Sequence, residues 1–240
     1  MGDRRIFALF DLGETLVDLK DLVACIGRRL RTEYPRIGGV ADETARAWIR
    51  RTSESLPREE GAPFVREIDV AVAVLRGLLL ASGIRITAER MEQFLRRAWD
   101  DFEDQVRFCP GVSPAWLKEI LSLAAGLGIV TDGDSTNVDR LVKRLRLTDY
   151  FGAITTSESV RAYKPSPRIY KAALEALGAE ARCSLFVSDT PLDLRGAAAV
   201  GMRTAFLPRG LLSEPADLPS GALHLASPRD LNAILQRLSS

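Results

Sequence analysis

An α/β fold with a doubly wound parallel sheet, interrupted by an all-helical insert, is the fold class that this 240-residue sequence predicts. Short apolar runs bounded by turn residues predict buried strands at 6–10, 127–131, 151–155, 184–188 and 203–207. Helical periodicity separates these runs from residue 113 onward. Strands that alternate with helices in this way form parallel sheets with helices on both faces.

The helices of the sheet domain begin and end at recognisable signals. Ser113-Pro114 and Ser166-Pro167 each combine an N-cap residue with a proline in the first helical turn. Gly178 ends the helix that Ser166 begins, because glycine readily adopts the left-handed conformation of a C-cap. Apolar spacing predicts the remaining helices at 138–145, 192–200 and 228–238.

Residues 18–107 contain helical periodicity without a convincing strand. One helix carries Val72, Leu75 and Leu79 on a common face, and another runs from a Thr87 cap to Phe102. We therefore expect a core domain of residues 1–17 and 108–240 and a helical domain of residues 18–107. A second apolar stripe on the first helix is either buried or a dimer contact, so both a monomer and a homodimer stay open.

Composition restricts the class of partner. The formal net charge is +1, and no long block of one sign occurs, so nothing favours nucleic acid or an anionic membrane. Three widely spaced cysteines and a single histidine form no zinc pattern, and we expect the thiols to be reduced. Asp11 interrupts the first apolar run too early for a signal peptide, which predicts a cytoplasmic protein that acts on a small molecule.

Polar side chains gather where the predicted strands end. In an open parallel sheet the carboxyl ends of the strands form the ligand crevice, so these residues are candidates for chemistry. A single Asp at a strand exit is as well explained by a turn cap. Five polar residues at such positions are harder to explain in that way: Asp11, Thr131, Lys164, Asp189 and Asp193.

These residue types are the parts needed to transfer a phosphoryl group to a carboxylate. Asp11 would be the nucleophile that forms an aspartyl-phosphate. Thr131 and the backbone amides beyond it, at Asp132 and Gly133, would hold the phosphate oxygens. Lys164 would neutralise the negative charge that develops on the transferred group. The predicted catalytic residues are therefore Asp11, Thr131 and Lys164. The predicted substrate-binding residues are Thr131, Asp132, Gly133 and Lys164.

The chain resembles the haloacid dehalogenase superfamily, because four motifs occur in that family's order: Asp11 to Thr15, Ile129 to Thr131, Lys164-Pro165 and Asp189 to Asp193. The resemblance covers essentially the whole chain. It implies a Rossmann-like core with a helical cap of the C1 type between the first two motifs. It also implies a Mg²⁺ cofactor, with Asp11, Asp189, Asp193 and the backbone carbonyl of Gly13 as ligands.

Gly13 departs from the family pattern. Most phosphatases of the family carry a second Asp at this position as the general acid and base. Proton transfer of this kind contributes a factor of about 10² to 10⁴ in rate. Its loss predicts a slow phosphatase, or one restricted to good leaving groups, although Glu14, Asp18, Asp132 or Asp134 could act instead.

The leading hypothesis is therefore a Mg²⁺-dependent phosphatase for a small phosphorylated metabolite. A protein that binds such a metabolite, or regulates a partner, without turnover is the alternative from another class, and Gly13 favours it. A 2-haloacid dehalogenase also lacks the second Asp, but it needs no metal and would leave Asp189 and Asp193 without a purpose. Phosphonatase chemistry needs a cap lysine, and Lys20 is the only lysine in that region.

Overall fold

The computed structural model describes residues 6–209 and 217–239 and contains the predicted parallel sheet. All neighbouring strands pair in parallel, in the order β3-β2-β1-β4-β5-β6. The first strand along the chain therefore lies inside the sheet, between β2 and β4. The strands are β1 Phe7–Phe10, β2 Gly126–Thr131, β3 Ala153–Thr156, β4 Ser184–Ser188, β5 Arg203–Phe206 and β6 Leu223–His224.

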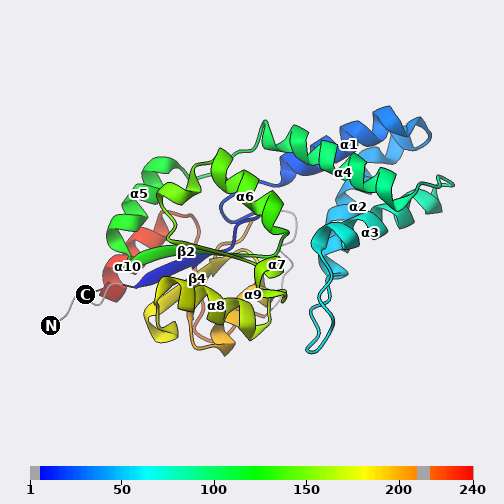
Figure 1. Ribbon diagram of the computed structural model, residues 1–240. Helices are drawn as coiled ribbons and strands as arrows, with labels where there is room; N and C mark the ends of the chain where they lie inside the picture. The colour runs from blue at the N-terminus through cyan, green and yellow to red at the C-terminus, as the bar shows by residue number, and fades with distance from the viewer. Residues whose placement is uncertain (1–5, 210–216, 240) are drawn as a thin grey trace. The chain divides into compact units, whose positions relative to one another are not determined.

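Helices cover both faces of this sheet, as the alternation of strands and helices predicted. Figure 1 shows α8 and α9 on one face and α5 and α6 on the other. The helices of this domain are α5 Pro114–Leu123, α6 Ser135–Arg144, α7 Ser157–Val160, α8 Pro167–Leu177, α9 Pro191–Ala199 and α10 Asp230–Ser239. Short 3-10 turns occupy Leu147–Asp149 and Ala181–Cys183.

Successive residues of β1 pack on opposite faces of the sheet. Leu9 belongs to a buried cluster with residues of α8 and α9. Phe10 lies edge-on to Trp116 of α5 and to Phe151, with ring centroids 6.0 and 5.9 Å apart. Because side chains alternate along a strand, a strand covered on both sides is apolar throughout. This burial explains the unbroken apolar run that precedes Asp11.

The predicted helix signals act as expected. The Ser113 hydroxyl accepts a hydrogen bond from the Trp116 amide, and the Ser166 hydroxyl accepts one from Arg168. Gly178 ends α8 with a φ of +62°, in the left-handed region. Each cap satisfies backbone groups that the helix itself leaves unpaired.

Two short elements were not expected from the sequence. The four-residue helix α7 follows β3, and β6 adds a sixth strand next to β5. His224, the single histidine of the sequence, lies in β6 and pairs with Phe206 of β5. A two-residue strand carries too short a pattern to be recognised, because its pairing partner alone defines it.

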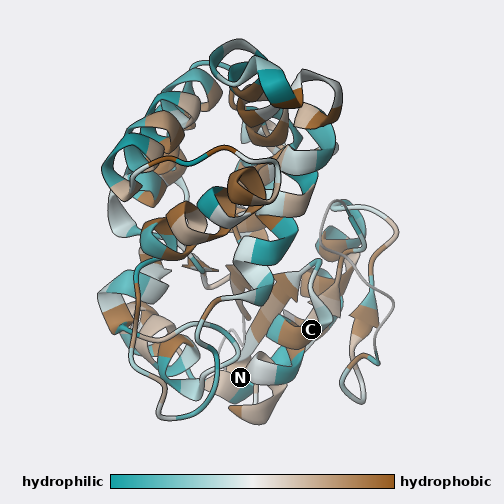
Figure 2. Ribbon diagram, turned by 90° about the vertical axis from the view of Figure 1, so that its right-hand side faces the viewer, coloured by the Kyte–Doolittle hydropathy of each residue, from teal (hydrophilic) through white to brown (hydrophobic). Residues whose placement is uncertain are grey.

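The helical cap is a separate compact unit, from Leu19 to Val106, whereas residues up to Asp18 and from Arg107 onward form the core unit. Its helices are α1 Lys20–Glu33, α2 Ala41–Glu54, α3 Glu67–Ala81 and α4 Ala88–Glu103, with a 3-10 helix at Pro35–Val40. Figure 2 shows hydrophobic and hydrophilic residues alternating along these helices, the pattern of a bundle that buries one side of each helix. Within the described ranges, no helix is long and apolar enough to cross a membrane.

Candidate active site

The strand order brings three predicted site residues to one edge of the sheet. Phe10 of β1 is aligned with Ile129 of β2 and with Val187 of β4. Asp11 follows Phe10 directly, and its amide donates to the Val187 carbonyl at 3.0 Å, which extends the pairing by one residue. Thr131 and Asp189 lie two residues beyond the aligned positions. The three residues therefore stand at the carboxyl ends of neighbouring strands, where the crevice of a parallel sheet forms.

Lys164 joins this group from the segment between α7 and α8. Its Nζ donates to Oδ1 of Asp11 at 2.6 Å and to Oδ2 of Asp193 at 2.6 Å. All three side chains are almost fully buried. Asp193 lies in the first turn of α9, and Tyr170 donates its hydroxyl hydrogen to the Asp193 carbonyl. The lysine is thus held between the predicted nucleophile and an acid from the following motif.

The buried charges shift one another's pKa values. Burial raises the pKa of Asp11 to about 6, although Lys164 lowers it, and the nearby Asp193 adds to the increase. Burial also opposes the charge of Lys164, but the carboxylates of Asp11, Asp193 and Asp132 outweigh it and raise the pKa of the lysine. Lys164 is therefore a permanent cation, and Asp11 is mostly ionised above pH 6.

The loop after β2 is held in place by side chains rather than left open. Asp132 accepts a hydrogen bond from the backbone amide of Lys164 at 2.9 Å. The amide of Gly133 donates to the hydroxyl of Ser157 at 2.9 Å. Thr131 is buried, and its hydroxyl makes a long hydrogen bond of 3.2 Å to the Asp132 carbonyl. Asp132 and Gly133, both predicted to bind substrate, therefore have structural partners that the sequence did not indicate.

The predicted metal ligands include the carboxylates of Asp11 and Asp189 and the backbone carbonyl of Gly13. No three Asp, Glu, His or Cys side chains in the described part of the chain converge as a metal cluster. Mg²⁺ keeps several waters and binds through one or two carboxylates, so Asp11, Asp189 and the carbonyl of Gly13 match its needs. The carboxylates of Asp11, Asp193 and Asp132 all interact electrostatically with the single cation of Lys164. The negative charge that Lys164 does not balance would suit a divalent cation. Asp193, the fourth predicted ligand, has its Oδ2 engaged by Lys164.

The turn after Asp11 gives no clear replacement for the missing acid. Glu14 is buried in a left-handed backbone conformation, with a φ of +55°. Burial raises the pKa of Cys109 to about 12, Arg209 lowers it, and Glu14, Asp18 and Asp189 raise it further. Glu14 therefore lies within electrostatic reach of that thiol. Asp134, another candidate, is the N-cap residue of α6.

One further polar atom in this turn is notable. The Thr15 hydroxyl is buried and has no hydrogen-bond partner within residues 6–209 and 217–239. A buried hydroxyl without a partner is uncommon, because its desolvation is then uncompensated. Thr15 closes the first motif, and its position alone did not distinguish it from an ordinary core threonine.

Comparisons with known proteins agree with this arrangement. The family described as haloacid dehalogenase-like hydrolase matches residues 8–207. A glyceraldehyde 3-phosphate phosphatase from Pyrococcus abyssi is 29% identical over 203 residues, which cover 84% of this chain and 80% of that protein. An (S)-2-haloacid dehalogenase from a Pseudomonas species is 32% identical over 96 residues, 40% of this chain and 41% of the other.

The fold itself is shared with solved dehalogenase structures. The L-2-haloacid dehalogenase from Xanthobacter autotrophicus superposes with a TM-score of 0.78 at 20% identity, over 97% of this chain and 98% of that one. The helical cap is inserted after the first strand here as in that family of structures. At this identity the likeness describes the fold and leaves the reaction open.

Proposed function

Since the chain belongs to the haloacid dehalogenase-like hydrolases, we propose that it is a Mg²⁺-dependent phosphatase for a small phosphorylated metabolite. One observation carries the proposal. Lys164 is held at 2.6 Å from both Asp11 and Asp193, in a buried site at the strand ends. The phosphatase from Pyrococcus abyssi, which is similar over most of the chain, supports the same choice.

In the proposed first step a carboxylate oxygen of Asp11 attacks the phosphorus atom. A bond forms between that oxygen and phosphorus, and the bond from phosphorus to the ester oxygen breaks. Lys164 keeps Asp11 oriented and offsets the negative charge of the transferred group. The hydroxyl of Thr131 and the amide of Asp132 are the candidate donors to the phosphate oxygens. Asp11, Asp189 and the backbone carbonyl of Gly13 would hold Mg²⁺, which would offset the negative charge of the phosphate.

In the second step water attacks the phosphorus of the aspartyl-phosphate and releases inorganic phosphate. Asp11 regains its carboxylate as the acyl-phosphate bond breaks. No side chain at Gly13 can supply a proton to the leaving oxygen or take one from the water. The departing oxygen would then take its proton from solvent, which favours leaving groups of low pKa such as acyl and aryl phosphates.

The sequence predicted Asp193 as a metal ligand, but its contacts favour a role in positioning Lys164. Its Oδ2 accepts a hydrogen bond from Lys164, and its backbone is fixed by Tyr170. It would therefore act through the lysine, as a residue that positions Lys164 rather than as a direct ligand of the metal. Asp189 and Asp11 then provide the carboxylate ligands of the proposed Mg²⁺ site.

Hydrolysis of p-nitrophenyl phosphate by the purified protein tests the proposal, with and without Mg²⁺. Turnover should require Mg²⁺ and disappear in Asp11→Asn, whereas Asp139→Asn, which removes an exposed carboxylate from α6, should leave the rate unchanged. Gly13→Asp should increase the rate toward alkyl phosphates by about 10² or more if proton transfer is what limits them. Turnover that survives in Asp11→Asn would contradict the mechanism.

A dehalogenase is the second candidate, favoured by the (S)-2-haloacid dehalogenase that is 32% identical over 96 residues. It predicts release of chloride from 2-chloropropionate without Mg²⁺, again dependent on Asp11. Phosphate or phosphosugar binding without turnover of either substrate would instead support the binding protein.

A further inference from the structure

A polar pocket lies in the helical cap, between the end of α1 and the start of α4. It encloses about 320 Å³, a size that suits a small metabolite. Its polar lining consists of Glu33, Tyr34, Arg85, Arg90, Gln93 and Arg97. We call this the arginine pocket. All of these residues belong to the cap, so the pocket is complete within that unit.

The pocket has more positive charge than its own carboxylate can balance. Glu33 accepts hydrogen bonds from Arg97 at 2.7 Å and from Arg29 at 3.2 Å, so its charge is already shared by two guanidinium groups. Neither Arg85 nor Arg90 forms an ion pair with a carboxylate among the residues that the structure describes. Three arginines thus face one acid that is already paired twice.

Tyr34 adds a hydroxyl to the pocket lining, within electrostatic reach of Glu33, Arg97 and Arg90. Burial raises the pKa of Tyr34, Glu33 raises it further, and Arg97 and Arg90 lower it. The hydroxyl therefore keeps its proton near neutral pH and is a donor. Packing against Phe94, with ring centroids 5.8 Å apart, supports the ring. The Gln93 side chain adds an amide donor to the same lining.

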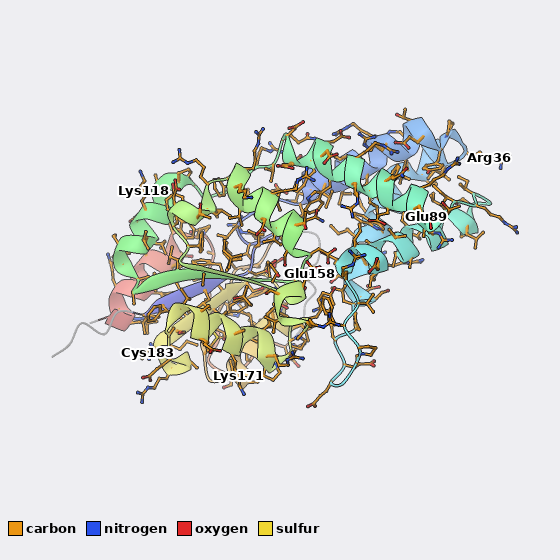
Figure 3. The ribbon with its side chains drawn as sticks, in the orientation of Figure 1. Arg36, Glu89, Lys118, Glu158, Lys171 and Cys183 are labelled. Carbon is orange, nitrogen blue, oxygen red and sulfur yellow. The ribbon has the colours of Figure 1, made fainter. Side chains whose placement is uncertain are left out.

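The chain enters the cap just before α1 and leaves it just after α4. The arginine pocket lies at the opposite end of this helix pair, where α1 ends and α4 begins. The two helices are antiparallel, since Arg29 pairs with Asp101 and Glu33 pairs with Arg97. A 14-residue helix such as α1 spans about 20 Å, which separates Glu33 from the point where the chain enters the cap. Figure 3 labels Arg36 and Glu89, which neighbour the pocket residues in sequence at this end.

We propose that the arginine pocket binds a small multivalent anion, a phosphate monoester or a dicarboxylate. Both classes present two or more anionic oxygens, which guanidinium groups bind through paired hydrogen bonds. Arg85 and Arg90 supply the charge that has no partner in the cap, and Tyr34 and Gln93 supply neutral donors. The site is independent of Asp11, and its occupancy does not depend on the proposed phosphatase reaction.

Arginine modification by phenylglyoxal, mapped residue by residue with mass spectrometry, tests this site on the full chain. Inorganic phosphate, glycerol 3-phosphate and malate are compared with sodium chloride of equal ionic strength. Arg85 and Arg90 should react about tenfold more slowly with at least one of these anions, as a charge-assisted contact requires. Arg96, an exposed arginine on α4 that pairs with Glu92, should react at the same rate throughout.

The pattern of protection decides the result. Protection by both phosphate compounds alone identifies a phosphate site, and protection by malate alone identifies a carboxylate site; either supports the proposal. In the double variant Arg85→Gln/Arg90→Gln, Arg97 should lose its protection. Equal protection of Arg96, or no protection of Arg85 and Arg90 by any of the three anions, would overturn it. Because the readout is mapped to these arginines, phosphate that binds near Asp11 cannot mimic it.

Discussion

Lys164 in the core and Arg29 in the cap each hold two carboxylates, but in opposite surroundings. Lys164 contacts Asp11 and Asp193 with only 3% of its side chain exposed. Arg29 contacts Asp101 at 2.6 Å and Glu33 at 3.2 Å with 24% of its side chain exposed. Water screens the second group, whereas the first interacts through the protein interior.

This difference agrees with the proposed catalytic role of the buried Lys164 group, whereas the Arg29 group is partly exposed on the cap. A buried ion pair is seldom more stabilising than apolar residues of the same shape, because both charges lose their hydration. Stability therefore gives little reason to bury Lys164 with acids. A site that must meet a charged substrate does give one, and perturbed carboxylates gather at such sites.

The largest expected effect on stability comes from breaking the buried group. Lys164→Met leaves Asp11 and Asp193 without their cation and should lower the free energy of unfolding by about 3–5 kcal/mol at pH 8. Urea denaturation at that pH, without metal, measures the change. Lys171→Met is the matched control, because Lys171 projects from α8 into solvent (Figure 3). A loss equal to that of the control would mean that the buried charges are not coupled.

The second effect is on the titration of Asp11. Carbon-13 NMR of labelled aspartates in the metal-free protein should give this carboxyl a pKa of about 6. The pKa of Asp11 is higher in the folded than in the unfolded protein, so folding favours the protonated carboxyl. The free energy of unfolding should therefore fall as the pH rises from the usual aspartate range through 6. Asp193→Asn should lower the pKa of Asp11, because it removes a neighbouring negative charge. An unchanged value in that variant would contradict the coupling between the two acids.

A third, intermediate effect tests whether neutral buried contacts hold the cap together. The Trp48 indole donates to the Ala71 carbonyl at 3.0 Å in a buried position. Trp48→Phe removes this donor, although the Ala71 carbonyl keeps its hydrogen bond within α3, and should cost about 1 kcal/mol. The Trp99 indole nitrogen is buried without a hydrogen-bond partner in the described residues, so Trp99→Phe loses no such bond. Thermal unfolding of both variants should show the greater loss for Trp48.

The smallest effects are expected at the exposed ion pairs of the cap. Arg29→Gln should cost at most about 1 kcal/mol, less at high salt, since its partners are partly exposed. Arg66→Gln breaks a pair with Asp69 in which both side chains are about half exposed, and its effect should be near zero. Unfolding in low and high salt compares the two. A cost for Arg29→Gln as large as that for Lys164→Met would remove the distinction between the two regions.

Local patterns in the sequence were enough for much of the fold and for part of the site. The apolar run before Asp11, the Ser113 and Ser166 caps and the terminal Gly178 each act over a few residues, so the sequence alone determines them. The positions of Asp11 and Thr131 at strand ends follow from the same patterns. The five polar residues that the sequence placed near strand ends also pointed to one crevice, because all parallel strands end on the same side.

Only the tertiary structure decided which of these residues meet. The contact of Lys164 with Asp11 joins residues 153 positions apart, and that with Asp193 joins residues 29 apart. The order of strands and the path of the loop after α7 bring them together, and neither leaves a local signal. Two further contacts also depend on long-range packing. The Asp132 carboxylate accepts a hydrogen bond from the Lys164 amide, and the Ser157 hydroxyl accepts one from the Gly133 amide. Residue types along the chain determine which groups can react, but burial and long-range packing determine their partners and hence their charge.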